Sequence, residues 1–125
     1  MKLSAESGSG NVIRSFRPGE LRLTEQTFDV HVILSANKII RDWKPAAFSE
    51  LSIADFEPAI ALDPEIILFG TGERQRFPDN ALMTEIMRQG IAFEVMDTAA
   101  ACRTFNVLVS EFREVVAALL VQNLR

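Results

Sequence analysis

The sequence predicts one α/β domain, in which an antiparallel β part at the N-terminus joins a small α/β half around a mixed sheet. Three observations predict it. Apolar and polar residues alternate along much of the first third, strand and helix patterns alternate over residues 66–111, and an apolar run follows at 115–121. The length of 125 residues fits one domain, and the 48% apolar content supports an ordinary hydrophobic core.

The first ten residues differ in composition from the rest of the chain. Residues 4–10 contain only Ser, Ala, Glu and Gly, which is typical of a flexible leader. We therefore expect a leader at residues 1–10 and a single α/β domain at residues 11–125.

The N-terminal part of that domain has the period of two that indicates half-buried strands. The expected strands cover residues 11–16, 21–23, 28–34 and 39–43. Pro18 and Gly19 separate the first two, since Pro18 presets φ and Gly19 accepts the positive φ of a type II turn. Residues 35–38 form the turn before the last of these strands.

Three polar residues mark the starts of helices in the remainder of the chain. Ser52 with Asp55 resembles a capping box, and a short helix follows until Asp63-Pro64. Asp79 caps a helix that ends at Gly90, and Asp97 caps another that continues to about residue 111.

Apolar runs between these helices predict buried strands at residues 66–69, 91–96 and 115–121. The strand–helix–strand–helix order over residues 66–111 predicts parallel strands with a right-handed crossover. Because residues 115–121 are apolar throughout, we place this segment inside the sheet rather than at its edge.

Composition excludes several classes of function. The chain has a formal net charge of −4, a single histidine (His31) and a single cysteine (Cys102). It cannot form an intrachain disulfide or a structural zinc site, and its charge does not suit nucleic acid. Lacking a secretory signal or an apolar stretch of about 20 residues, it is expected in the cytoplasm without membrane insertion. No cofactor or metal is expected, and any catalytic pair that needs an imidazole must use His31.

The carboxyl ends of the two parallel strands are the place where an open α/β sheet binds ligands. Residues 70–78 and 96–98 follow these strands, so the two loops are expected side by side. Backbone N–H groups and arginines there suggest a site for an anion or a nucleotide. The candidate ligand-binding residues are Gly70, Thr71, Gly72, Arg74, Arg76, Asp97, Thr98, Arg103 and Asn106.

Each of these features also has a structural interpretation. The glycines allow a sharp exit from a buried strand, and the carboxylates of Asp79 and Asp97 compete with an anion for the N–H groups of the helix starts. Arg103 and Asn106 share a helix face that suits either a cleft or solvent. Cys102 is either an activated thiol near a helix start or a packed one, and the packed state is favoured.

Two stretches together resemble a known family. They are Leu68–Gly72 followed by Arg76–Pro78, and the long segment from Gly90 to Leu108. Ile13–Phe16, Pro18-Gly19 and Asp42-Trp43 extend the likeness over nearly the whole chain. The sequence is similar to a family of small uncharacterised bacterial and archaeal proteins that includes mitochondrial complex I assembly factor 3.

The resemblance implies a three-layer α/β fold whose central mixed sheet has a last strand antiparallel to the others. This chain has Phe105 where the family often has Tyr, and Phe112 where it often has Gly. The family has no assigned biochemical activity, and the assembly role belongs to its eukaryotic member. The resemblance, together with the presence of only one histidine and one cysteine, favours a non-enzymatic binding or assembly module with an unidentified protein partner. The alternative is a binder or enzyme for a small anion or nucleotide, and pairing of an N-terminal edge strand could also give a homodimer.

Overall fold

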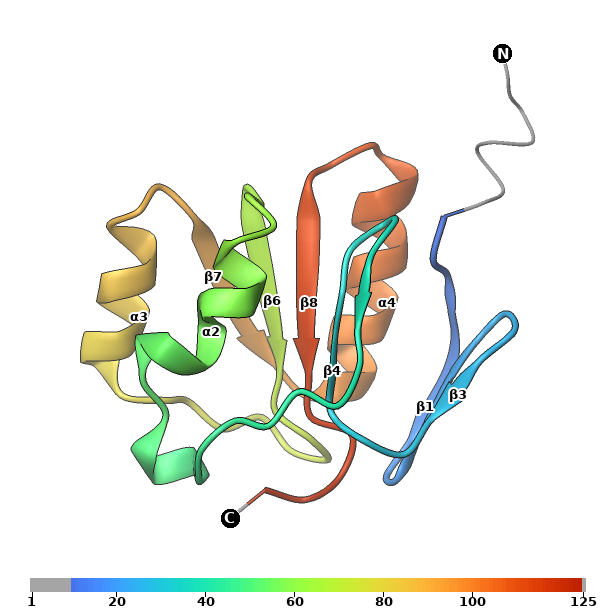
Figure 1. Cartoon of the computed structure of the whole chain (residues 1–125), viewed down its shortest axis with the longest axis horizontal. Coiled ribbons are helices and arrows are strands. Elements are labelled where there is room, and N and C mark those ends of the chain that lie inside the picture. Colours follow the sequence, from blue (N-terminus) through green and yellow to red (C-terminus); the bar gives the residue numbers. More distant parts are fainter. Residues whose placement is uncertain (1–9, 125) are drawn as a thin grey trace.

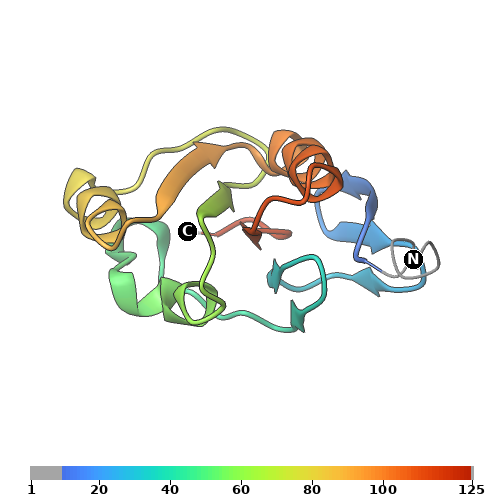
Figure 2. The same ribbon diagram turned by 90° about the horizontal axis from the view of Figure 1, so that it is seen from above.

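The computed structural model describes residues 10–124, so the predicted leader lies outside the described residues except for Gly10. The chain forms three layers (Figure 1). A five-stranded sheet lies in the middle. Figure 2, which looks along its strands, shows α4 and a three-stranded sheet on one side and α2 and α3 on the other. The predicted α/β class with a central mixed sheet and an antiparallel N-terminal part is confirmed.

The helices and strands follow the predicted order. The strands are β1 (Ile13–Arg17), β2 (Glu20–Leu23), β3 (Thr27–Phe28), β4 (Val32–Leu34), β5 (Ile39–Ile40), β6 (Ile66–Gly70), β7 (Ala92–Met96) and β8 (Val115–Leu119). The helices are the 3-10 turn η1 (Phe48–Glu50), α2 (Ile53–Ile60), α3 (Asn80–Met87) and α4 (Thr98–Ser110). Within residues 10–124, no helix has the length and apolar character needed to cross a membrane.

The five-stranded sheet has the order β5-β4-β8-β6-β7. Strands β6 and β7 are parallel, as predicted, and β8 occupies the predicted interior position. The expectation that the last strand runs antiparallel to the others is wrong, because β8 is parallel to β6 and antiparallel only to β4. The physical reason is α4, which returns the chain to the end of the sheet where β7 began, so that the next strand runs in the same direction.

The three-stranded sheet β1-β2-β3 is antiparallel, and Gly19 has the expected positive φ of 84° between β1 and β2. One predicted strand, at residues 28–34, is in fact two. Phe28 belongs to the three-stranded sheet and Val32–Leu34 to the five-stranded sheet, with a bend between them. The period of two misled the prediction because β4 is covered on both faces, so Ile33 is as fully buried as its neighbours.

The predicted helix starts are confirmed by their hydrogen bonds. Asp79 and Asp97 cap α3 and α4 by accepting from the N–H groups of Ala81 (3.2 Å) and Ala100 (2.8 Å). At the start of α2, Asp55 Oδ2 accepts from the Ser52 N–H at 2.9 Å. These carboxylates satisfy donors that have no partner within the helix, and they complement the positive end of its dipole.

The central sheet separates two hydrophobic cores. One lies under α4 and the three-stranded sheet, and the other lies under α2, α3 and η1. Phe69 is the centre of the second core, fully buried and surrounded by four aromatic rings. Its ring centroid lies 5.1–6.3 Å from those of Trp43, Phe48, Phe56 and Phe93.

Removal of the Phe69 ring should be strongly destabilising. We expect Phe69→Ala to lower the free energy of unfolding by about 3–5 kcal/mol, because the fully buried ring leaves a cavity that its neighbours fill only in part. Phe77→Ala is the matched control, since its ring is 63% exposed, and it should change stability by less than about 0.5 kcal/mol. Urea unfolding measures both, and equal losses would contradict this account of the core.

Candidate functional site

The two predicted strand-end loops lie side by side at the carboxyl ends of β6 and β7. The N–H of Thr71 donates to the Met96 carbonyl at 2.9 Å, and that of Thr98 donates to the Gly72 carbonyl at 2.9 Å. The sequence therefore placed the loops correctly. The anion site proposed for them depends on whether their N–H groups are available to a ligand.

The Thr98 hydroxyl joins three segments at this point. It accepts from the Gly72 N–H at 2.8 Å and donates to the Leu120 carbonyl, also at 2.8 Å. Thr98 is fully buried, as its place between the ends of β6 and β8 requires. The Gly72 N–H, which sequence reasoning offered to an oxyanion, thus has a partner inside the protein.

The two glycines have different roles. A Cβ on Gly70 would lie 2.9 Å from Leu119 Cδ2 and 3.0 Å from Thr98 Cα, so this glycine allows the start of α4 to approach β6. Gly72 has φ of 99° with open space around its Cβ position, so it is needed for the backbone turn. Both observations agree with the structural interpretation of these glycines.

The three candidate arginines do not converge on one point. Arg76 lies over the Phe48 ring, with Cζ 3.9 Å from the centroid, and it donates to the Leu124 carbonyl at 2.9 Å. Arg74 is exposed, and its carbonyl accepts from the Thr71 hydroxyl at 2.6 Å. Arg103 is exposed on α4. Anion binding by this set of residues stays a prediction.

Asn106 fastens the three-stranded sheet to α4. Its side-chain Oδ1 accepts from the Ile13 N–H at 3.0 Å, and its Nδ2 donates to the Ile13 carbonyl at 2.8 Å. It lies more than two helical turns from Asp97, a distance of roughly 13 Å along the axis. The structure therefore does not bring Asn106 together with the strand-end loops.

His31 has a structural partner that the sequence did not reveal. Its Nδ1 accepts from the Val121 N–H at 3.0 Å, so this nitrogen must be unprotonated. Burial lowers the pKa of His31 below its usual 6.5, and the nearby Asp42 carboxylate opposes that shift. A hollow of about 290 Å³ lies beside it, between Asp42 and Gln122.

Cys102 is a packed thiol. Burial raises its pKa to about 12, and Asp97 adds to the shift while Arg103 opposes it. The thiol is therefore protonated near neutral pH, where only the thiolate is a strong nucleophile. Within residues 10–124, no three His, Cys, Asp or Glu side chains gather in a group that could hold a metal ion.

A second hollow lies at the opposite end of the sheet, and Asn106 is the one candidate site residue that lines it. It has a volume of about 950 Å³ and is lined by residues that include Asn11, Leu62, Val109, Phe112 and Glu114. Phe112 is the sequence signal that could have indicated this hollow. Gly is preferred just beyond the C-cap of a helix, so a large apolar residue at that position is unusual.

Loss of the Thr98 hydroxyl should loosen the strand ends. We expect Thr98→Val, which keeps the shape, to lower the free energy of unfolding by about 3 kcal/mol, because the Gly72 N–H and the Leu120 carbonyl both lose a buried partner. Thr104→Val on the same helix is partly exposed and should cost less than about 0.5 kcal/mol. If the two variants unfold at the same urea concentration, the hydroxyl is not the link described above.

The His31 contact should make stability depend on pH. Because the folded-state pKa lies below 6.5, the unfolded chain binds more protons just below that pH. The contribution is present above pH 6.5 and is lost as the pH falls toward the folded-state pKa. We expect urea midpoints to decline between about pH 7 and 5.5. His31→Gln, whose amide oxygen can still accept from Val121, should remove this part of the slope, and an unchanged slope would refute the assignment.

These features define a small three-layer α/β protein with hydrogen-bonded strand ends and a separate open hollow. The chain belongs to the family described as protein of unknown function (DUF498/DUF598), whose model matches residues 13–120. The resemblance stated from the sequence is thereby confirmed.

Relatives and solved structures agree with this assignment. The chain is 33% identical over 121 residues to NADH dehydrogenase [ubiquinone] 1 alpha subcomplex assembly factor 3 of Danio rerio, covering 94% of this chain and 68% of that protein. It is 30% identical to the 13 kDa major membrane protein of Francisella tularensis, over 82% of this chain and 84% of that one. A solution structure of a Xanthomonas campestris protein has a TM-score of 0.84 at 33% identity, covering 100% of this chain and 96% of that chain. The chain spans less than half the length of the frog, cattle and human assembly factors of the same name.

Proposed function

We propose that this protein is a non-enzymatic binding module that holds another protein during assembly. The observation that carries the proposal is the closure of the strand ends, where Thr98 takes up the Gly72 N–H that a small anionic ligand would need. The relatives named as assembly factors support a protein partner. We propose, as expected from the sequence, that the protein acts in the cytoplasm.

The state of the two most versatile side chains also supports a binding role. The Cys102 thiol is buried with a raised pKa, and the His31 imidazole is engaged by the Val121 N–H. Neither is free to act as a nucleophile or a general base without breaking up its surroundings. A second copy of the chain, paired through an N-terminal edge strand, is the alternative protein partner.

Affinity purification tests the proposal directly. The full chain, tagged and crosslinked in native lysate, should recover a protein partner in stoichiometric amount. Recovery of no such partner would contradict the proposal. Light scattering of the purified chain distinguishes a homodimer from a complex with a different protein. A homodimer has twice the mass of the chain even when no other protein is present.

A thermal-shift screen tests the competing function. Nucleotides, phosphorylated metabolites and carboxylates at millimolar concentration should leave the melting temperature unchanged. The reason is that a ligand stabilises the folded state only in proportion to its binding, by RT ln(1 + [L]/Kd). A reproducible rise that disappears in Arg74→Ala would favour the anion site instead, whereas Arg88→Ala, an exposed arginine at the end of α3, should change nothing.

A further inference from the structure

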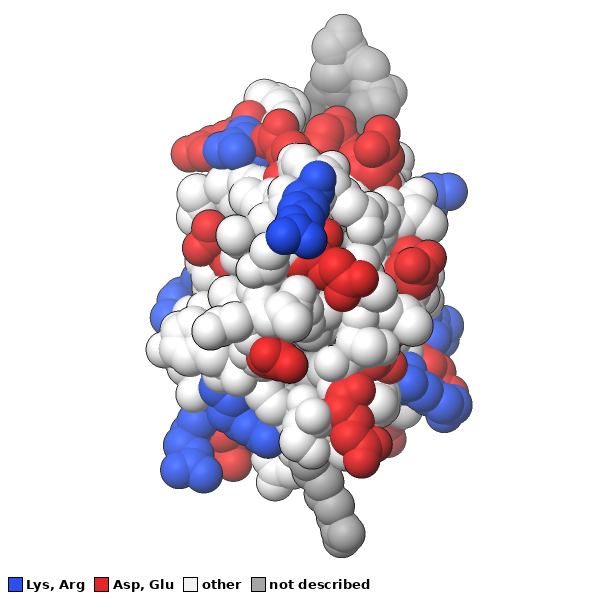
Figure 3. All heavy atoms as spheres, turned by 90° about the vertical axis from the view of Figure 1, so that its left-hand side faces the viewer, with Lys and Arg blue, Asp and Glu red and all other residues white. Residues whose placement is uncertain are grey.

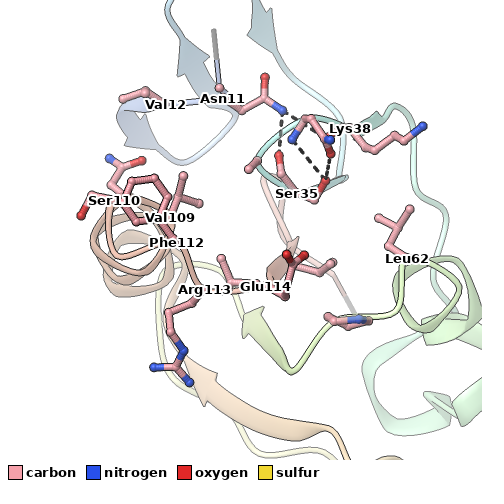
Figure 4. Close-up of a pocket in the computed structure, with 17 residues that line it drawn as sticks. Asn11, Val12, Ser35, Lys38, Leu62, Val109, Ser110, Phe112, Arg113 and Glu114 are labelled. Carbon is pink, nitrogen blue, oxygen red and sulfur yellow. Dashed lines mark hydrogen bonds between the residues drawn. The ribbon is translucent and has the colours of Figure 1, made fainter. Parts of the chain in front are cut away.

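The cavity of about 950 Å³ has the size of a binding site rather than a packing defect. It opens at the end of the sheet where β8 begins. Figure 4 shows that its walls come from the end of α4, the segment at residues 35–38 and the segment that follows α2. Val109 and Leu62 contribute apolar surface from opposite sides.

The wall opposite α4 is held in place by hydrogen bonds from Asn11 to backbone carbonyls. Asn11 Nδ2 donates to the carbonyls of Ser35 at 2.8 Å and Lys38 at 3.1 Å, and the Asn11 N–H donates to the Ala36 carbonyl at 2.7 Å. Asn106, at the back of the cavity, fixes the next residues of the same segment through Ile13. The cavity is therefore preformed, which lowers the entropy that binding must overcome.

Phe112 stands at the mouth of this cavity in an unfavourable backbone conformation. Its φ is 62°, and it is the first residue beyond the C-cap of α4. The N–H of Phe112 donates to the Val109 carbonyl, and that of Arg113 to the Leu108 carbonyl, a pattern in which Gly is preferred. The ring is 88% exposed, so its packing within the described chain does little to offset the cost of the positive φ, and the ring is available to a partner.

The charged groups around the cavity point in different directions. In Figure 4 the Glu114 carboxylate lies toward the middle of the cavity, while the Arg113 guanidinium and the Lys38 ammonium point away from it. Arg113 is paired with Glu65 instead. Acidic side chains also gather at the upper end of the face in Figure 3, the end at which the cavity opens.

An exposed aromatic ring, apolar walls and one inward carboxylate together suit a long side chain that ends in a cation. A guanidinium can stack on the Phe112 ring and pair with Glu114, while its methylene stem covers Leu62 and Val109. The net charge of −4 complements a basic partner. A purely apolar occupant would leave the Glu114 carboxylate without a counter-charge.

We infer that this cavity docks an arginine side chain with apolar neighbours, carried by a basic segment of a partner protein. The inference rests on the proposed function and names the surface that performs it. Glu114 and Phe112 are the residues that determine specificity.

Nuclear magnetic resonance titration of the full chain with the peptide acetyl-Leu-Arg-Leu-amide tests the inference. Saturable amide shifts should concentrate on the residues that line the cavity. The matched peptide acetyl-Leu-Glu-Leu-amide should bind at least about fivefold more weakly, because its carboxylate faces Glu114. Equal affinity for the two peptides, or shifts centred elsewhere, would overturn the inference.

Two variants separate recognition from folding. Glu114→Gln and Phe112→Gly should each weaken Leu-Arg-Leu binding at least about threefold. Phe112→Gly should not lower the melting temperature, since Gly accepts the positive φ. The controls Glu94→Gln and Phe77→Ala change an exposed carboxylate and an exposed ring outside the cavity, and should bind as the wild type does. Unchanged binding in both cavity variants would overturn the inference.

Other occupants would have distinct signatures. If butylguanidinium binds as tightly as the peptide, the cavity is a small-molecule site. If the amide shifts of cavity residues grow with protein concentration alone, the occupant is a second copy of the chain. Either result overturns the docking inference. If crosslinking recovers the same partner with the wild type and with both variants, Glu114→Gln and Phe112→Gly, the proposed function is supported. The same result refutes the inference that this cavity binds the partner. Peptide binding as expected, with no partner recovered from lysate, would support the inference and refute the assembly role.

Discussion

A single buried hydroxyl joins the carboxyl ends of three parallel strands. Thr98 is the first residue of α4, and one residue, Asp97, separates it from the end of β7 at Met96. Its Oγ1 accepts from the Gly72 N–H in the loop after β6 and donates to the Leu120 carbonyl after β8. The close approach depends on Gly70, where even one methyl group would collide with Thr98. In many α/β proteins this edge of the sheet is open to a ligand. Here the Thr98 hydroxyl forms hydrogen bonds with the Gly72 N–H and the Leu120 carbonyl, and these bonds hold the strand ends together.

Most of the fold could be predicted because its signals are local. The helix starts at Asp79 and Asp97 and the apolar run at residues 115–121 each depend on a few neighbouring residues, and all three are confirmed. The bend between Phe28 and Val32 was missed because alternation along one stretch does not reveal that the chain passes from one sheet to another. The direction of β8 was assigned wrongly from resemblance, although the length of α4 favours a parallel return.

The site residues were harder to predict, because a polar side chain in a sequence does not show its partner. Thr98 and Asn106 were candidates for ligand contacts, but their partners are backbone groups of Gly72 and Ile13. Arg76 was a candidate for anion binding, and its guanidinium lies on Phe48. In each case the partner is more than 20 residues away along the chain, and only the folded structure brings it within reach. Of the residues that line the cavity, the sequence indicated only Asn106, because the walls come from segments far apart in the sequence.

The two ends of α4 explain how one helix serves both stability and recognition. At its start, the Asp97 carboxylate accepts from the Ala100 N–H, and the Thr98 hydroxyl links the ends of β6 and β8. At its end, Phe112 holds a positive φ that favours glycine and exposes a ring to solvent. Asn106 lies between the two and ties the helix to β1, so the strained end cannot relax by shifting the helix. The contacts of α4 therefore fix the backbone position of Phe112, and this arrangement suits a surface that must meet a partner without a large backbone rearrangement.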